Sequence, residues 1–156
     1  MNTTLEQAPT VPQRPVEILL VEDNPGDITL IQELLKDSHF AVHLSVLRDG
    51  ENVLAFLQHQ TPYLTSPRPD FILLDLSLPY RSGFEVASDI KHSYHLKQIP
   101  TLILTGSNND IDRWSAAQVR ADAYLLKPRE LPEFSALLNY LEENWMKDVP
   151  LDNPPN

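Results

Sequence analysis

The chain has 156 residues, 42% of them hydrophobic, and a formal net charge of -10 at pH 7. This length suits one domain with a full-sized core and is too short for two ordinary domains. The negative charge would be repelled by a phosphate backbone, so we expect no binding to nucleic acid. No apolar run is long enough to cross a bilayer, and residues 1–15 lack the apolar core of a signal peptide. Because the chain has no cysteine, disulfides and thiolate zinc sites are excluded, and we expect a cytoplasmic protein with no membrane contact.

The first half of the chain alternates short apolar runs, typical of buried strands, with amphipathic segments, typical of helices. Proline favours the first turn of a helix, and the acidic or amide side chain before it favours the N-cap position. The elements expected here are, in chain order, a strand over Val16–Val21, a helix from Pro25 to Leu35 capped by Asp23 or Asn24, a strand over Val42–Leu47, and a helix through Val53–Leu57 capped by Asp49.

The second half repeats the same alternation after a proline-rich stretch, Gln58 to Pro69, which we interpret as a long loop. Two further proline-rich stretches, residues 1–15 and 147–156, are expected to be a flexible lead and a flexible tail. The expected elements are a strand over Phe71–Leu74, a helix over Gly83–Lys91, a strand over Thr101–Leu104, a helix over Asp110–Val119, a strand over Ala123–Leu126 and a helix over Leu131–Trp145.

Five alternations of strand and helix predict an α/β fold, a doubly wound parallel sheet with helices on both faces. Right-handed crossovers place the carboxyl ends of all the strands at one edge of the sheet, and ligands bind at that edge. The sequence predicts one domain over residues 16–146 with this architecture.

Polar side chains follow four of the five predicted strands, namely Glu22 and Asp23, Asp75, Thr105 and Lys127. Carboxylates brought together repel one another, and a hard divalent ion such as Mg²⁺ relieves that repulsion. The glycine-rich loops of nucleotide-binding proteins are absent from the sequence. A carboxylate nucleophile, a metal ion and a lysine together indicate a site that forms an acyl phosphate.

These residues, in this order, resemble the response-regulator receiver family of two-component signalling. The resemblance rests on the pair Glu22-Asp23, the stretch Asp75-Leu-Ser-Leu-Pro79 with Gly83 beyond it, Thr105-Gly-Ser107 and Lys127-Pro128, and it extends over about Val16 to Trp145. The family implies the flavodoxin-like strand order 2-1-3-4-5. Glu22 stands where many members have aspartate, and its longer side chain suits contact with the metal through water.

The resemblance also implies a role for each residue of the site. These roles are Asp75 as phosphoryl acceptor and metal ligand, Asp23 as direct Mg²⁺ ligand, Glu22 as a ligand through water, Ser77 as a backbone carbonyl ligand, Lys127 as partner of a phosphoryl oxygen, Thr105 as switch hydroxyl and Tyr124 as switch aromatic. An ordinary packing role for Tyr124 is an equal alternative. The Lys127-Pro128 bond is similar to one that is cis in the family.

The family implies a histidine kinase as phosphoryl donor, and the lengthened loop and the Val21-Glu-Asp-Asn24 start resemble receivers that serve phytochrome-type kinases of photosynthetic bacteria. The chain ends about ten residues after the last expected helix, so we expect a stand-alone signalling protein rather than an enzyme, with output through protein contacts. The family uses its fourth helix, fifth strand and fifth helix for such contacts and for homodimers.

Two alternative functions remain open at the level of sequence. One is a receiver-fold interaction module that works without phosphorylation, although the complete set of site residues is unfavourable to it. The other is a phosphatase, which would need a second carboxylate where Ser77 stands.

Other polar and aromatic side chains have both an ordinary and a functional interpretation. His92 and His95 are expected to be solvated surface rather than metal ligands. Trp114, Tyr140 and Trp145 fit either core packing or an interface.

Overall fold

The computed structural model describes residues 14–38, 41–106, 123–127, 139 and 143. Five parallel strands form one sheet in the order β2-β1-β3-β4-β5. Their bounds are β1 Val16–Val21, β2 Val42–Leu47, β3 Phe71–Asp75, β4 Thr101–Thr105 and β5 Ala123–Leu126. The predicted strand order is therefore confirmed, and β3 and β4 each extend by one residue to include Asp75 and Thr105.

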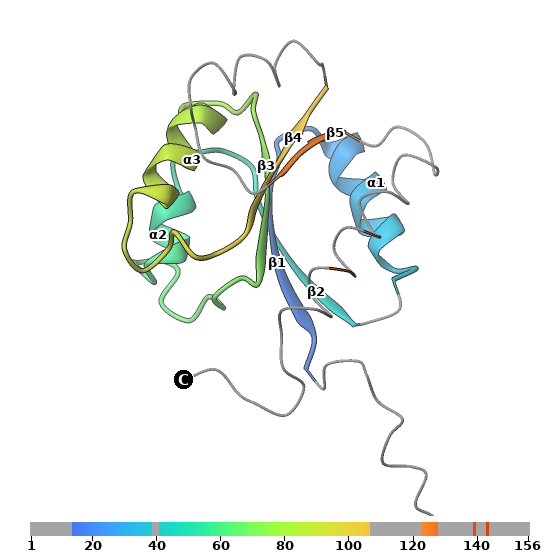
Figure 1. Cartoon of the computed structure of the whole chain (residues 1–156), viewed down its shortest axis with the longest axis horizontal. Helices are drawn as coiled ribbons and strands as arrows, with labels where there is room; N and C mark the ends of the chain where they lie inside the picture. Colours follow the sequence, from blue (N-terminus) through green and yellow to red (C-terminus); the bar gives the residue numbers. More distant parts are fainter. Residues whose placement is uncertain (1–13, 39–40, 107–122, 128–138, 140–142, 144–156) are drawn as a thin grey trace, which may run out of the picture.

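The described helices lie on both faces of the sheet (Figure 1). Helix α1, Pro25–Leu35, covers one face, and α2, Val53–Leu57, and α3, Gly83–Lys91, cover the other. This arrangement confirms the doubly wound architecture. The helices expected over 110–119 and 131–145 fall outside the described residues, apart from helical positions 139 and 143. No helix in the described ranges is long and apolar enough to cross a membrane.

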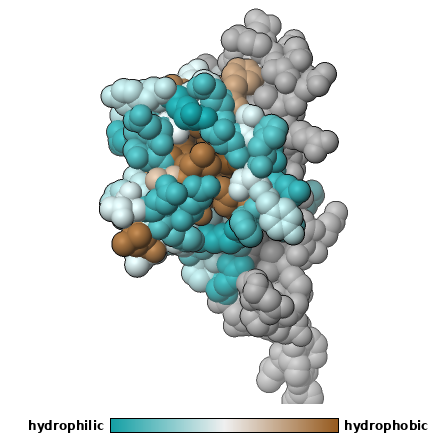
Figure 2. Space-filling model, turned by 90° about the vertical axis from the view of Figure 1, so that its left-hand side faces the viewer, coloured by the Kyte–Doolittle hydropathy of each residue, from teal (hydrophilic) through white to brown (hydrophobic). Residues whose placement is uncertain are grey.

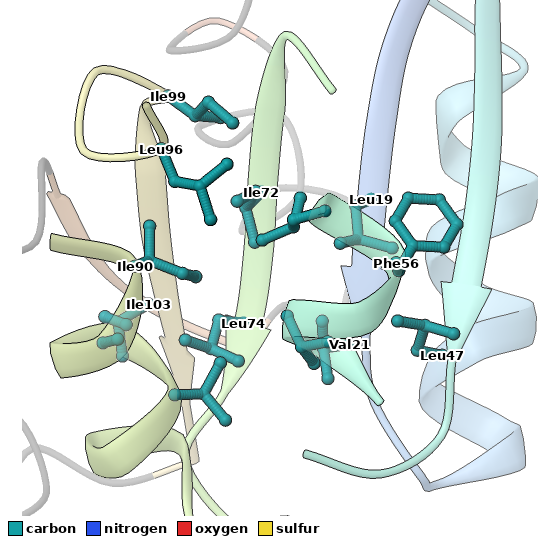
Figure 3. Packing of buried hydrophobic residues seen from close by; sticks show 14 of the residues in the cluster. Leu19, Val21, Leu47, Phe56, Ile72, Leu74, Ile90, Leu96, Ile99 and Ile103 are labelled. Carbon is teal, nitrogen blue, oxygen red and sulfur yellow. The ribbon is translucent and has the colours of Figure 1, made fainter. Parts of the chain in front are cut away.

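The hydrophobic core has two halves because successive residues of a strand point to opposite faces of the sheet. In β1, Ile18 and Leu20 pack with α1, whereas Leu19 and Val21 pack with α2 and α3. Figure 3 shows this second half, where side chains from the central strands meet those of the two helices. Its labelled members are Leu19, Val21, Leu47, Phe56, Ile72, Leu74, Ile90, Leu96, Ile99 and Ile103. Burial on both faces explains why these strands are almost continuously apolar.

Side-chain caps fix the first turns of α1 and α3. Asn24 is the N-cap of α1, and its Oδ1 accepts a hydrogen bond from the backbone N–H of Asp27 at 2.9 Å. Ser82 and Glu85 form a reciprocal capping box at the start of α3. Such caps satisfy backbone donors that no helical carbonyl can reach. The first cap follows β1 and the second follows β3, and both strands lead to predicted site residues.

The residue predicted as the N-cap of α2, Asp49, was wrong. Asn52, not Asp49, is the residue that precedes the helix, and its side chain makes no capping hydrogen bond. Asp49 Oδ1 instead accepts hydrogen bonds from the backbone N–H groups of Glu51 and Asn52, at 2.9 and 3.2 Å. Gly50 lies tightly against the carbonyl of Arg81. This contact with the β3–α3 loop favours a turn over residues 49–52 before the helix begins.

The segment from Gln58 to Pro69 contains neither helix nor strand, as the sequence predicted. It is nevertheless packed onto α2. The Ser66 hydroxyl lies 2.8 Å from the carbonyl oxygen of Phe56, and the rings of Phe56 and Tyr63 are 5.5 Å apart. On the face that carries α2 and α3, hydrophobic atoms occupy a hollow surrounded by hydrophilic residues (Figure 2).

Candidate functional site

The sheet brings the predicted site residues to a single edge. Asp75 pairs with Leu104 and Thr105 with Leu126, so the carboxyl ends of β3, β4 and β5 lie beside one another. Val21, the last residue of β1, pairs with Leu74, which places Glu22 and Asp23 next to Asp75. Parallel pairing therefore converts positions more than a hundred residues apart into one site.

Three carboxylates of this edge form a group that fits a metal ion. Glu22, Asp23 and Asp75 each offer an oxygen, and these oxygens lie within 4.8 Å of one another. Glu22 and Asp75 are buried, with 0% and 3% of their surface exposed, whereas Asp23 is exposed. Two buried oxygens, Glu22 Oε1 and Asp75 Oδ2, make no hydrogen bond. Buried carboxylate oxygens that make no hydrogen bond, together with a surplus of negative charge, are what a hard divalent cation satisfies.

Lys127 supplies the positive charge of the site. Its Nζ lies 3.4 Å from Asp75 Oδ1 and 3.1 Å from Glu22 Oε1, and it donates to Glu22 Oε2 at 3.2 Å. The nearest carboxylate, however, is that of Asp27 on α1, whose Oδ2 accepts a hydrogen bond from Nζ at 2.9 Å. One ammonium therefore faces three carboxylates, and the group remains net negative without a metal.

Burial and mutual repulsion shift the titration of the site. Burial, helped by the charge of Asp75, raises the pKa of Glu22 from 4.5 to about 7, although Lys127 opposes the rise. Burial also raises the pKa of Asp75, against the charge of Lys127 and a backbone hydrogen bond from Ser77. Burial alone would lower the pKa of Lys127, but its hydrogen bond to Asp27 and the charges of Asp75 and Glu22 raise it. Lys127 therefore stays protonated, whereas Glu22 and Asp75 favour the neutral form more than usual.

The loop after β3 is held close to Asp75 by backbone contacts. The N–H of Gly83 donates to the carbonyl of Leu76 at 3.0 Å. A Cβ at Gly83 would overlap the Asp75 carbonyl oxygen and the Leu76 Cα, so only glycine fits here. Ser77 is exposed, and its backbone hydrogen-bonds the Asp75 carboxylate. Glycine at position 83 thus allows the loop to fold back over the end of β3.

Comparison with known proteins places this site in a family. The model of the response regulator receiver domain matches residues 18–139. The chain belongs to the response-regulator receiver family. It is 43% identical over 137 residues to the response regulator Rcp1 of Synechocystis, and the match covers 88% of this chain and 93% of Rcp1.

Solved receiver structures share the fold, and two of them are described with a divalent metal. The crystal structure of the Mn²⁺-bound form of Rcp1 matches with a TM-score of 0.74 and 42% identity, over 89% of this chain and all of that one. The phosphorylated cyanobacterial phytochrome response regulator RcpA matches with a TM-score of 0.76 and 36% identity, over 90% of this chain and all of that one. A receiver domain of Pseudomonas aeruginosa with magnesium in its active-site cleft matches with a TM-score of 0.65 and 27% identity, over 86% of this chain and all of that one. As in other receivers, the metal suited to the acidic group is divalent, which agrees with the expected Mg²⁺.

The structure describes the two predicted switch residues, Thr105 and Tyr124, to different extents. Thr105 is fully buried at the end of β4, and its carbonyl accepts the backbone N–H of Lys127 at 2.7 Å. Tyr124 lies in β5 opposite Ile103, but its side chain is outside the described part of the structure. The bond between Lys127 and Pro128 also lies outside it. The switch role of Tyr124 therefore stays a prediction.

The residue that sequence reasoning missed is Asp27. An aspartate in the first turn of a helix is expected on the grounds of the helix dipole alone, and it gives no sign of a partner a hundred residues away. Of the two histidines considered, His92 Nδ1 lies 2.7 Å from the Ser88 carbonyl oxygen, and His95 makes an edge contact with the ring of Tyr94. Neither joins a metal-binding group in the described ranges. Trp114, Tyr140 and Trp145 lie outside those ranges.

Proposed function

We propose that Asp75 accepts a phosphoryl group from a phosphohistidine of a histidine kinase. The observation that carries this proposal is the state of its carboxylate. Asp75 is 3% exposed, its Oδ2 makes no hydrogen bond, and its Oδ1 lies 3.4 Å from Lys127 Nζ. A buried carboxylate with one unbonded oxygen beside a cation suits nucleophilic attack better than a structural role.

The transfer forms one bond and breaks another. A carboxylate oxygen of Asp75 attacks the phosphorus, the bond from phosphorus to the histidine nitrogen breaks, and its electron pair stays on the imidazole. Asp23 and Asp75 would bind the metal directly, with the Ser77 carbonyl as a further ligand and Glu22 through water. A bound divalent ion would neutralise the charge on the transferring phosphoryl oxygens.

Lys127 and Thr105 would both contact the phosphoryl group once it is on Asp75. Lys127 Nζ, already 3.4 Å from Asp75, would bind one phosphoryl oxygen as a charge-assisted donor. Thr105 ends the neighbouring strand and would turn its hydroxyl toward another oxygen. In our proposal the ring of Tyr124 follows Thr105 inward, because the two residues stand on adjacent strands, and the surface of β5 changes.

The partner we propose is a phytochrome-type histidine kinase. The proposal is supported by the similarity to Rcp1 and to RcpA, which is described as a phytochrome response regulator. Phosphorylation would change the contacts made by the fourth helix, β5 and the fifth helix, including those of a homodimer. In this view residues 16–146 form the receiver domain in the cytoplasm, between a lead over residues 1–15 and a tail over residues 147–156.

Phosphorylation by a small donor tests the proposal. Wild-type protein, incubated with acetyl phosphate and Mg²⁺, is expected to gain one phosphoryl group by intact mass spectrometry. Asp75→Asn is expected to gain none, and a chelator should abolish the gain in the wild type. Asp70→Asn is a matched control, since Asp70 lies at the opposite end of β3. Labelling that persists in Asp75→Asn, or no labelling of the wild type, would overturn the proposal.

A further inference from the structure

Lys127 is held between helix α1 and the acceptor aspartate. Its Nζ is 2.9 Å from Asp27 Oδ2, 3.1 Å from Glu22 Oε1 and 3.4 Å from Asp75 Oδ1. Lys127 has 16% of its side chain exposed and Asp27 has 32%, so both are sheltered from water. An ion pair in this setting is screened less than one on the open surface. In the unphosphorylated protein the lysine is thus closer to Asp27 than to the residue it is expected to serve.

Both members of this pair stand on rigid elements. Asp27 lies in the first turn of α1, where its N–H is bonded to the Asn24 side chain and Pro25 opens the helix. Lys127 directly follows β5, and its N–H is bonded to the carbonyl of Thr105. The distance between the two side chains is therefore set by the packing of helix on sheet rather than by two mobile surface chains.

Among the described residues, the contact that joins Asp27 to the site is its ion pair with Lys127. Its carboxylate is not part of the metal-binding group of Glu22, Asp23 and Asp75. A lysine ammonium has three donors, and here three carboxylates surround it. A phosphoryl group on Asp75 would add a charge of about -1.5 to -2 and three strong acceptors. At least one of the present contacts must then be weakened for Lys127 to bind a phosphoryl oxygen.

We propose that Asp27 is a positioning residue that holds Lys127 on the α1 side of the site until Asp75 is phosphorylated. The proposal rests on the proposed function of Asp75. While Asp27 binds the ammonium, the acceptor carboxylate stays open to the metal and to the phosphoryl donor. When the phosphoryl group arrives, it competes with Asp27 for the same ammonium. Asp27 therefore favours the metal-bound, unphosphorylated state and opposes the phosphorylated one.

The test uses beryllofluoride, a mimic of the phosphoryl group, in the full chain with saturating Mg²⁺. Binding is followed by ¹⁹F NMR for wild type, Asp27→Asn and Asp27→Glu. We expect Asp27→Asn to bind beryllofluoride about threefold to tenfold more tightly, because its competitor charge is gone. Without beryllofluoride the same variant should bind Mg²⁺ more weakly, because the freed Lys127 moves toward Asp75. Asp27→Glu, which keeps the charge, should stay within about twofold of the wild type.

Two controls separate positioning from a general effect of charge. Glu33→Gln removes a charge from the same helix, at an exposed residue paired with Lys36, and should change neither affinity. In a Lys127→Met background, Asp27→Asn should lose its effect, as a double-mutant cycle requires when one residue acts through another. If Lys127→Met abolishes beryllofluoride binding, the cycle is measured from Mg²⁺ affinity instead.

The outcomes distinguish this inference from the proposed function. Failure of the wild type to bind beryllofluoride with Mg²⁺ overturns both. Wild-type binding with an unchanged Asp27→Asn, or an equal effect in Glu33→Gln or in the Lys127→Met background, overturns the positioning role alone. A melting temperature lowered in Asp27→Asn without any change in either affinity also overturns it, because that pattern belongs to an acid that only stabilises the first turn of α1.

Discussion

Glu22 makes the stability of the site depend on pH in an unusual direction. Its side chain is fully buried, and its pKa rises from 4.5 to about 7, first because of burial and then because of Asp75. Between these two pH values the folded protein holds a proton that the unfolded chain releases. A folded pKa above the unfolded one means that the contribution of Glu22 to metal-free stability is fully present below pH 4.5 and is lost as pH rises through about 7.

The size of the effect follows from the shift. Proton linkage lowers the free energy of unfolding by up to about 1.4 kcal/mol per pH unit. Between pH 4.5 and about 7 the total is about 3 kcal/mol. For a protein of this length this corresponds to a fall in Tm of roughly 6–12 °C. A divalent metal binds the ionised acid, so its affinity should rise about tenfold between pH 6 and 8, as the ionised fraction of Glu22 rises from about 0.1 to about 0.9.

Calorimetry between pH 5 and 8, with and without Mg²⁺, measures both quantities. Glu22→Gln is the control, because glutamine keeps an acceptor for Lys127 and for the Asn24 N–H but does not titrate. Its metal-free Tm should fall less steeply than that of the wild type over the same range, because Asp75 is then the remaining acid of the site with a raised pKa. A wild-type metal-free Tm that stays level or rises from pH 5 to 7 would contradict the raised pKa of Glu22. Full wild-type pH dependence in Glu22→Gln would contradict it as well.

Two substitutions outside the acidic group test the supporting structure. Gly83→Ala would force a Cβ against the backbone of Asp75 and Leu76. We therefore expect about 1–3 kcal/mol of destabilisation in urea unfolding and slower labelling by acetyl phosphate. Unchanged stability would contradict that close contact. Asp70→Ala removes a bidentate partner of Arg14 and the acceptor of the Glu17 N–H, so we expect the free energy of unfolding to fall by about 1–3 kcal/mol while labelling of Asp75 stays intact. Asp70→Asn keeps an acceptor for the Glu17 N–H and should be less destabilised. Equal destabilisation by the two substitutions would contradict a contribution from that backbone hydrogen bond.

Much of the fold could be predicted from the sequence because the pattern of the strands is so apolar. Runs such as Ile18–Val21 and Phe71–Leu74 are apolar at successive positions, which indicates burial on both faces and hence a parallel sheet. Topology then dictates that residues after the strands share an edge. Asp75, Thr105 and Lys127 were found in this way, and the family resemblance assigned their roles.

The cap of α2 shows where local sequence misleads. Asp49 has the right side chain for an N-cap, and its position before Val53–Leu57 favoured that role. The contact of Gly50 with the Arg81 carbonyl belongs to a different loop, more than thirty residues along the chain. No local pattern reports such a contact, so the start of the helix was predicted too early.

The sequence by itself determined the alternation of the described elements, the polar residues that follow the strands, and the lysine. Only the tertiary structure decided which acid lies nearest the lysine. Asp27 and Lys127 are a hundred residues apart, and their 2.9 Å contact depends on how α1 packs against the sheet beside β5. The burial that raises the pKa of Glu22 has the same origin, since solvent exclusion depends on all the elements packed around a residue and not on its neighbours in sequence.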